Sequence, residues 1–152
     1  MSRIPDVRAI CAAHGNDPAA LLEILHEVQD SAGCVPDSVI PDIAQALNLS
    51  RADVHGVVSF YHDFRRDPAG RAHVKICRAE ACQAVGALGL IDRLCGRHGL
   101  KLGDTTPDGA LTVEAVYCLG NCALGPSAMI NGALQGRLND AKLQQAIVEA
   151  GA

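Results

Sequence analysis

Four cysteines in two closely spaced pairs are the residues of this chain best suited to chemistry. Cys77 and Cys82 enclose four residues, Cys118 and Cys122 enclose three, and 35 residues separate the two pairs. Thiolates at such spacings bind one tetrahedral metal ion or an iron–sulfur cluster, and a 2Fe–2S rhomb takes two sulfurs on each iron. The pattern therefore indicates a metal or cluster site that uses all four sulfurs.

Three other uses of these cysteines compete with a cluster. A structural zinc site also takes four sulfurs, although the gap within each pair is usually about two to four residues. A disulfide framework is disfavoured because the chain has seven cysteines, an odd number, and no mark of secretion. Thiol–disulfide exchange prefers a C-x-x-C motif, which the sequence lacks. A zinc-stabilised assembly module with no redox role therefore stays open as the alternative from a different functional class.

The remaining cysteines and the histidines are expected to be structural. Cys95 falls in an apolar helical stretch, while Cys11 and Cys34 are isolated from each other and from both pairs. Free cysteine is a normal small core residue, so packing is the expected role of all three. A Rieske centre needs two histidines beside two cysteines, and no such arrangement recurs in the sequence. No acid–base dyad, nucleophile triad or phosphate-binding loop stands out, so one-electron transfer is the chemistry expected.

The distribution of charge argues against nucleic acid as a partner. The net charge is −4, with 10 acidic and 5 basic side chains in residues 1–70 and 7 and 8 in residues 71–152. Neither half offers the basic surface that phosphate binding requires. Residues 36–60 have the pattern of a DNA-reading helix-turn-helix, but they contain one Arg against three Asp. We therefore expect no role in reading DNA.

The hydropathy pattern favours a cytoplasmic protein without a membrane segment. The start of the chain lacks the apolar stretch and cleavage site of a signal peptide. No apolar run approaches the ~20 residues that a membrane helix needs. Apolar residues make up 49 % of the chain and aromatic residues only 3 %, so the core must consist mainly of Leu, Ile, Val and Ala.

Residues 1–70 are predicted to form an N-terminal helical region that docks on a partner. Asp17-Pro18 marks a helix start and Gly33 an end, Pro36 opens a second helix, and Ser50 to Asp53 fits a capping box before a third. The first helix has an apolar face of Leu21, Leu22, Ile24, Leu25 and Val28. The second is expected to have Val39, Ile40, Ile43, Ala44 and Leu47 on its inner side, and the third to carry Val54, Val57, Val58 and Tyr61. The breaker cluster at residues 67–70 sets the domain boundary.

Residues 71–152 are predicted to form a small sheet covered by helices. The expected strands are 73–77, 111–116, 128–130 and 133–136. The expected helices run from about Val85 to Arg97, ended by Gly99, and from Asn139 or Asp140 onward, with Leu143, Ile147 and Val148 inward. This order indicates an α+β or α/β layer of the thioredoxin-like kind. Both cysteine pairs then fall in loops at strand ends, where sites in such sheets gather.

Two residues beside the second pair support a tight loop. Gly120 lies between Cys118 and Cys122, and glycine permits the positive φ that a three-residue bite around one iron requires. Pro126 occupies the position at which a thioredoxin-like fold has a cis proline beside its site, and cis is an option open to X–Pro bonds.

These residues resemble the thioredoxin-like 2Fe–2S subunits that accompany the flavin subunit of NADH-oxidising complexes, among them respiratory complex I and NAD-reducing hydrogenases. The resemblance covers nearly the whole chain and is carried by residues 22–33, residues 54–61, the four-cysteine frame and Pro126. Complex I relatives tend to have Gly and Thr between the first two cysteines, where this chain has Arg78-Ala79-Glu80-Ala81. The sequence is therefore most similar to the gamma subunit of molybdenum-containing, NAD-dependent formate dehydrogenase.

The resemblance implies a helical bundle, residues 1–70, followed by a thioredoxin-like 2Fe–2S ferredoxin domain, residues 71–152. It implies a non-catalytic electron-transfer subunit whose cluster is held by Cys77, Cys82, Cys118 and Cys122. The partners would be a flavin- and NAD-binding beta-type subunit and a molybdenum catalytic subunit that oxidises formate. FMN, NAD, further iron–sulfur clusters and the molybdenum cofactor would belong to those partners. The alternative is the equivalent subunit of complex I or of an NAD-reducing hydrogenase.

Overall fold

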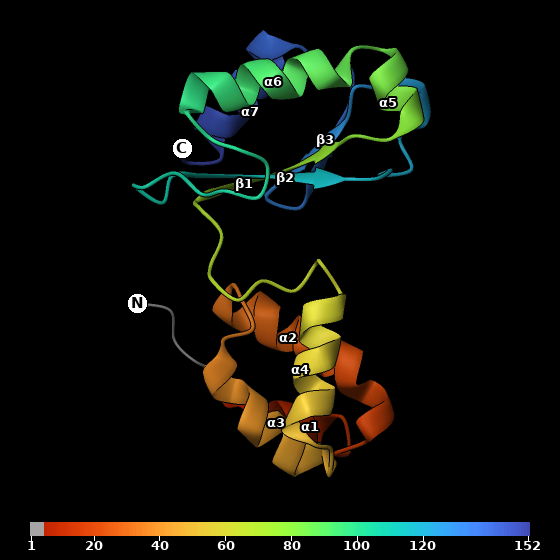
Figure 1. Ribbon diagram of the computed structural model, residues 1–152, viewed down its shortest axis with the longest axis vertical. Coiled ribbons are helices and arrows are strands. Elements are labelled where there is room, and N and C mark those ends of the chain that lie inside the picture. Colours follow the sequence, from red (N-terminus) through yellow and green to blue (C-terminus); the bar gives the residue numbers. More distant parts are fainter. Residues whose placement is uncertain (1–4) are drawn as a thin grey trace. The chain divides into compact units, whose positions relative to one another are not determined.

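The structure, a computed structural model, describes residues 5–152 and divides into two compact units, Met1–Pro68 and Ala69–Ala152 (Figure 1). The first unit is helical and the second contains a sheet with helices, so the predicted α+β class and the order of its parts are confirmed. The helical prediction for residues 1–4 lies outside the described residues.

The helical unit consists of four α-helices and two short 3-10 helices within residues 5–68. The α-helices are α1 (Val7–Ala13), α2 (Leu21–Ala32), α3 (Ile40–Leu47) and α4 (Arg51–Phe60), and the 3-10 helices η1 (Pro18–Ala20) and η2 (Asp37–Val39) precede α2 and α3. Helix α1 has no counterpart among the helix starts predicted from sequence. Its seven residues give barely two turns of periodicity, which is too little for a pattern to stand out.

The predicted start and stop signals act as expected in this unit. The Asp17 carboxylate accepts a hydrogen bond from the backbone N–H of Ala19, and Gly33 ends α2 in the left-handed conformation with φ of 79°. Ser50 and Asp53 form a reciprocal capping box at the start of α4. These local interactions satisfy backbone groups that a helix end leaves unpaired.

The first core lies among the four helices and consists of aliphatic side chains, as the composition requires. Its fully buried members include Ile24, Leu25, Val28, Ile43 and Val54. Tyr61 departs from the prediction, because α4 ends at Phe60 and the tyrosine is 43 % exposed.

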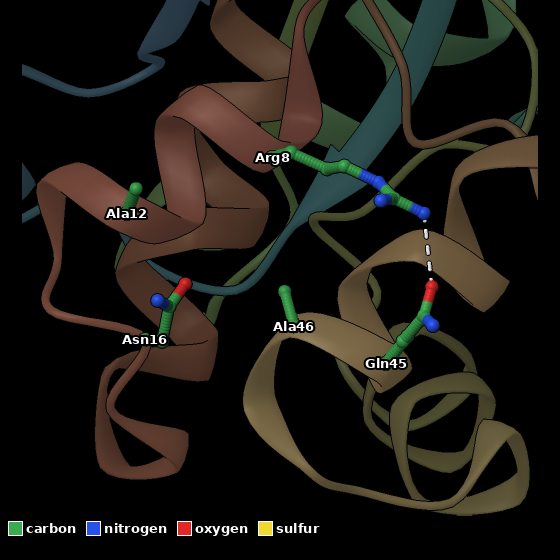
Figure 2. A pocket seen from close by; sticks show the side chains of 5 residues that line it. All are labelled: Arg8, Ala12, Asn16, Gln45 and Ala46. Atoms are coloured by element: carbon green, nitrogen blue, oxygen red, sulfur yellow. Dashed lines mark hydrogen bonds between the residues drawn. The ribbon is translucent and has the colours of Figure 1, made fainter.

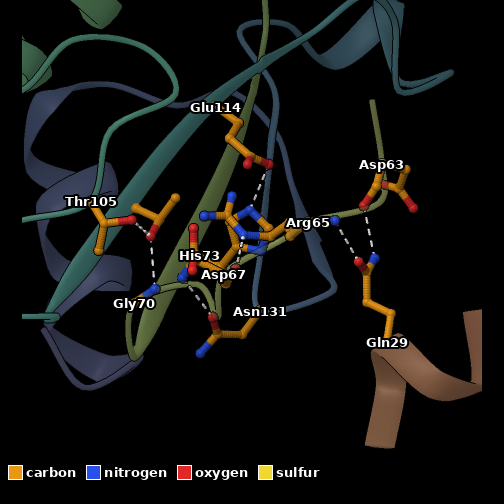
Figure 3. Close-up of polar contacts among 10 residues, drawn as sticks. Gln29, Asp63, Arg65, Asp67, Gly70, His73, Thr105, Glu114 and Asn131 are labelled. Atoms are coloured by element: carbon orange, nitrogen blue, oxygen red, sulfur yellow. Dashed lines mark hydrogen bonds and ion pairs between the residues drawn. The ribbon is translucent and has the colours of Figure 1, made fainter. Parts of the chain in front are cut away.

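The exit of the chain from this unit is held by the Gln29 side chain (Figure 3). The amide of Gln29 donates to the carbonyl oxygen of Asp63 at 2.8 Å and accepts from the backbone N–H of Arg65 at 2.7 Å. The Gln29 side chain, on α2, thus satisfies two backbone groups of the segment after α4, which has no regular secondary structure to pair them.

The second unit contains four strands and three α-helices within residues 69–152. The strands are β1 (Ala72–Cys77), β2 (Leu111–Val116), β3 (Ala128–Ile130) and β4 (Ala133–Gln135); the helices are α5 (Glu80–Ala84), α6 (Ala87–His98) and α7 (Asp140–Glu149), with a 3-10 turn η3 (Cys122–Leu124). The sheet order is β2-β1-β3-β4. Strand β2 is parallel to β1, whereas β3 is antiparallel to both β1 and β4.

Helices α6 and α7 cover one face of this sheet (Figure 1). Alternate residues of β1, namely Ala72, Val74 and Ile76, are fully buried against them. Helix α6 begins at Ala87 rather than at Val85, and it ends at Gly99 as predicted. Val148 was expected to face inward and is instead exposed.

Polar contacts stabilise the end of the sheet that lies opposite the cysteines (Figure 3). The side chain of Asn131 accepts from the backbone N–H of His73 at 2.8 Å and donates to the carbonyl oxygen of Arg71 at 2.9 Å. The hydroxyl of Thr112, fully buried, accepts a hydrogen bond from the backbone N–H of Gly70 at 2.7 Å.

None of the helices that the structure describes within residues 5–152 has the length and apolar character that would let it cross a membrane.

We predict that Ser50→Ala destabilises the helical unit by about 1 kcal/mol, because it removes the hydroxyl that caps α4. Urea unfolding followed by far-UV circular dichroism measures this change. Ser59→Ala, an exposed position on the same helix, is the control and should change stability by less than about 0.5 kcal/mol. Equal stability of Ser50→Ala and the wild type would contradict the role of the cap.

Candidate metal centre

The four predicted ligands lie at one edge of the sheet, because β1 and β2 run in the same direction. Cys77 is the last residue of β1 and is in register with Val116, the last residue of β2. Cys118 follows only two residues later, and the backbone N–H of Arg78 donates to the carbonyl oxygen of Val116 at 2.7 Å. Parallel pairing thus brings together two stretches that are distant in sequence.

Cys82 occupies a position that the sequence interpretation described incorrectly. It lies on the short helix α5 rather than in a loop, and it is only 2 % exposed. The side-chain amide of Gln83 donates to the carbonyl oxygen of Arg78 at 2.8 Å, which closes the turn between β1 and α5. Helix α5 thereby brings the Cys82 sulfur within hydrogen-bond distance of the Cys77 sulfur.

The loop of the second pair contains the positive φ that the sequence predicted. Gly120 has φ of 74°, and Cys118 itself has φ of 88°. The backbone N–H of Gly120 donates to the Cys118 sulfur at 3.3 Å. The sulfurs of Cys118 and Cys122 are 3.6 Å apart, and Cys122 opens the turn η3. This loop therefore holds two sulfurs side by side, as one iron requires.

The sulfur of Cys77 is surrounded by hydrogen-bond donors. Burial opposes its ionisation, yet the backbone N–H of Ala79, the thiol of Cys82 and the backbone N–H groups of Cys118 and Leu119 outweigh that effect. The pKa of Cys77 is consequently lowered. Donors from both cysteine loops stabilise negative charge on this one sulfur.

Two other sulfurs resist ionisation in the absence of a metal. Burial raises the pKa of Cys82, and so does its thiol hydrogen bond to Cys77. The hydrogen bond to Cys118 raises the pKa of Cys122, and the negative charge of Cys118 adds to the effect. A bound cation would favour the thiolate form of Cys82 and Cys122.

The two pairs differ in their exposure to solvent. Cys77 and Cys82 are each 2 % exposed, whereas Cys118 and Cys122 lie at the surface. The site thus has a buried side and a solvent-facing side.

A third segment, just before β3, contacts the first pair. The peptide bond between Gly125 and Pro126 is cis, which is the isomer that the sequence left as an option. The carbonyl oxygen of Ser127 accepts from the backbone N–H of Cys77 at 2.9 Å, and its own N–H donates to the Cys82 sulfur. A Cβ atom at Gly125 would lie 3.3 Å from that sulfur, so this position favours glycine.

Sequence reasoning overlooked two polar residues beside the site. Asn121 lies inside the C-x3-C loop, and its side-chain N–H donates to the hydroxyl of Ser127 at 3.1 Å. The sequence did contain a signal for Asn121, because it is a polar residue between the two cysteines of the second pair. Ser127 had no such signal, because only the fold brings it to the cysteines.

The other three cysteines lie in apolar surroundings, as predicted for packing residues. Cys11 and Cys34 are buried in the helical unit, and Cys95 is half-buried beside the second core. Burial raises the pKa of each of these thiols.

Two histidines that the sequence assigned to structural or surface roles contact carboxylates. A ring nitrogen of His73 lies 2.7 Å from a carboxylate oxygen of Glu114, and a ring nitrogen of His14 lies 3.0 Å from a carboxylate oxygen of Glu27.

The donor chemistry fits a binuclear cluster. Four sulfurs form two pairs, and backbone N–H groups point at three of those sulfurs. A 2Fe–2S rhomb takes two sulfurs on each of two irons, and hydrogen bonds to sulfur help to set its potential.

A hollow in the helical unit offers less for ligand chemistry (Figure 2). It has a volume of about 240 Å³ and is lined by Arg8, Ala12, Asn16, Gln45 and Ala46. The Arg8 guanidinium donates to Gln45 at 2.9 Å and also pairs with a carboxylate on α3. Its charge is therefore already partnered within the unit.

The chain matches proteins of one family along most of its length. Residues 7–151 match the family described as Thioredoxin-like [2Fe-2S] ferredoxin. The chain is 38 % identical over 139 residues to one subunit of the NADH-quinone oxidoreductase of Pseudomonas aeruginosa, covering 89 % of this chain and 84 % of that protein. It is 30 % identical over 129 residues to the HndA subunit of the NADP-reducing hydrogenase of Solidesulfovibrio fructosivorans, covering 85 % and 75 %.

A solved structure supports the same fold. A chain of an NAD+-reducing [NiFe]-hydrogenase in its H2-reduced state superposes with a TM-score of 0.77 at 24 % identity. The match covers 89 % of this chain but only 22 % of that one, so the present chain spans about a fifth of its length. The predicted thioredoxin-like fold class is thereby confirmed, and this chain belongs to the thioredoxin-like [2Fe-2S] ferredoxin family.

Proposed function

We propose that this chain is an electron-transfer subunit that carries one 2Fe–2S cluster beside a flavin- and NAD-binding partner. The observation that carries the proposal is the meeting of two cysteine pairs at one sheet edge in a member of a 2Fe–2S family. The chain offers no catalytic residue in this proposal, so substrate chemistry belongs to other subunits.

Cys77, Cys82, Cys118 and Cys122 are the proposed ligands. When bound, the cluster supplies reversible transfer of one electron. The chain's own contribution is to orient the four sulfurs and to donate N–H hydrogen bonds to them. Such hydrogen bonds favour the more negative, reduced state and so raise the reduction potential relative to bare thiolates.

Electrons would pass on the side of Cys118 and Cys122, because those sulfurs are exposed while the other pair is buried. Apolar side chains next to the cysteine loops are also exposed: Tyr117 at 72 %, Val85 at 55 % and Leu124 at 39 %. Apolar groups that surround a redox site suit an interface that excludes water from the electron path.

The names of the relatives support an NAD-linked partner. One relative is a subunit of an NADH-quinone oxidoreductase, and another is a subunit of an NADP-reducing hydrogenase. In the proposal the partner binds FMN and NAD, and the helical unit of this chain provides part of the docking surface. The cytoplasmic location expected from the sequence stays a prediction.

The finer proposal is that the complex oxidises formate with NAD+. It rests on the segment Arg78-Ala79-Glu80-Ala81 between the first two cysteines, which differs from the Gly and Thr of complex I relatives. A molybdenum catalytic subunit and further iron–sulfur clusters would then complete the assembly. The equivalent position in complex I or in an NAD-reducing hydrogenase is the alternative.

The purified chain is predicted to absorb visible light and to give a paramagnetic signal after reduction by one electron. Both properties follow from a 2Fe–2S centre and neither from zinc. Optical and EPR spectra, with iron and sulfide analysis, measure them. A colourless protein that contains one zinc per chain would overturn the proposal in favour of a structural assembly module.

Replacement of a single ligand tests the assignment of sulfurs. Cys118→Ser is expected to lose or destabilise the cluster, because oxygen is a poor substitute for a soft thiolate. Cys95→Ser is the matched control and should retain full iron content, since that cysteine packs beside the core of α6 and the sheet. Loss of colour in the Cys95 variant would show that the ligand set is wrong.

The identity of the complex is testable by copurification. We expect a tagged version of this chain to recover a flavin subunit and a molybdenum subunit, and the recovered complex to reduce NAD+ when formate is added. Hydrogen- or quinone-linked activity without formate oxidation would assign the chain to a different member of this family of complexes.

A further inference from the structure

Ser127, in the segment before β3, contacts the segments of both cysteine pairs through different atoms. Its carbonyl oxygen accepts from the backbone N–H of Cys77 at 2.9 Å, and its N–H donates to the sulfur of Cys82. Its hydroxyl turns the other way, toward the loop that contains the second pair. Ser127 is 1 % exposed, so these polar atoms depend on protein partners.

The hydroxyl of Ser127 is fully engaged by that loop. It accepts from the side-chain N–H of Asn121 at 3.1 Å. It can donate to the carbonyl oxygen of Leu124 at 3.3 Å or to that of Asn121 at 3.4 Å. Asn121 immediately precedes Cys122, so its side chain connects the second pair to the segment before β3, which contacts the first pair.

Gly136, the residue that follows β4, limits the space around the Asn121 side chain. A Cβ atom at Gly136 would lie 2.7 Å from the side-chain nitrogen of Asn121 and 2.9 Å from the carbonyl oxygen of Leu124. The same carbonyl accepts from the backbone N–H of Arg137. Gly136 thus leaves just enough room for the Asn121 side chain to reach Ser127.

We propose that the hydrogen bond between Asn121 and Ser127 is a positioning contact that fixes the Cys118–Cys122 loop relative to Cys77 and Cys82. Neither residue is a ligand, and each acts through the sulfurs next to it. The inference rests on the proposed function, because its consequence is expressed in the properties of the cluster. Residues that orient ligands also tune a metal centre, and their replacement typically costs about 10- to 100-fold in metal affinity or activity.

The effect on the cluster follows from the exposure of the second pair. Cys118 and Cys122 lie at the surface, whereas Cys77 and Cys82 are buried. Loss of the Asn121 contact frees their loop to move away from the buried pair. The cluster would then gain solvent access, which changes its potential and speeds its loss.

Asn121→Ala removes the contact directly, and Gly136→Ala disturbs it without altering either partner. We expect both variants to lose iron to excess EDTA about 10-fold faster than the wild type, within the range known for residues that support ligands. Their midpoint potentials and EPR g-values are expected to shift as well. Ser127→Thr keeps the hydroxyl and is expected to retain values close to those of the wild type.

Asn131→Ala is the matched control. Asn131 also joins two main-chain segments through its side chain, but it lies at the opposite end of β3. This variant is expected to lower thermal stability and to leave the potential and g-values unchanged. If Asn121→Ala behaves in the same way, its role is merely structural and the proposal is overturned.

Hydrogen exchange in the metal-free chain separates this inference from the proposed function. Asn121→Ala is expected to speed exchange at the amides of residues 118–125 and to leave the helical unit unaffected. A wild-type chain that never acquires a cluster would refute the proposed function, while the exchange rates still test the contact. Unchanged exchange, or unchanged potential in a loaded Asn121→Ala protein, would refute the positioning role alone.

Discussion

The parallel pairing of β1 with β2 is the constraint on which the whole site depends. It aligns Cys77 with Val116, so that both strands end at the same edge and deliver one cysteine pair each. A shift of register by one residue would turn the alternate side chains of β1 to the opposite face. The fully buried Val74 and Ile76 oppose such a shift, because their burial against α6 and α7 would be lost. The core of the second unit therefore fixes the position of the sulfurs.

Backbone amides, rather than charged side chains, form the electrostatic environment of the site. N–H groups of Ala79, Leu119 and Gly120 are directed at sulfur atoms, and their positions follow from turns and from the end of β1. The basic side chains of residues 71–152 leave that half of the chain near neutrality. Dipoles held by the main chain are well suited to this role because they need little reorganisation when charge arrives.

The helical unit has a core of its own, and its helices are set by local signals. The capping box of Ser50 and Asp53, the glycine end of α2 and the Gln29 contacts to the main chain all act within residues 5–68. The family match nevertheless extends over residues 7–151 and includes this unit. Each unit buries its apolar residues in a core of its own.

The amino-acid sequence alone was enough to predict the cysteine frame, most helix and strand positions, and the positive φ at Gly120, because each depends on spacing or on local backbone preference. It failed at the short helix α5, whose five residues show no periodicity, and at Val148, whose exposure depends on which neighbours cover it. The contact between Asn121 and Ser127, the amides around Cys77 and the contrast between a buried and an exposed sulfur pair exist only in the folded chain. They arise where three chain segments meet at one sheet edge, and no local pattern encodes which atoms face each other there.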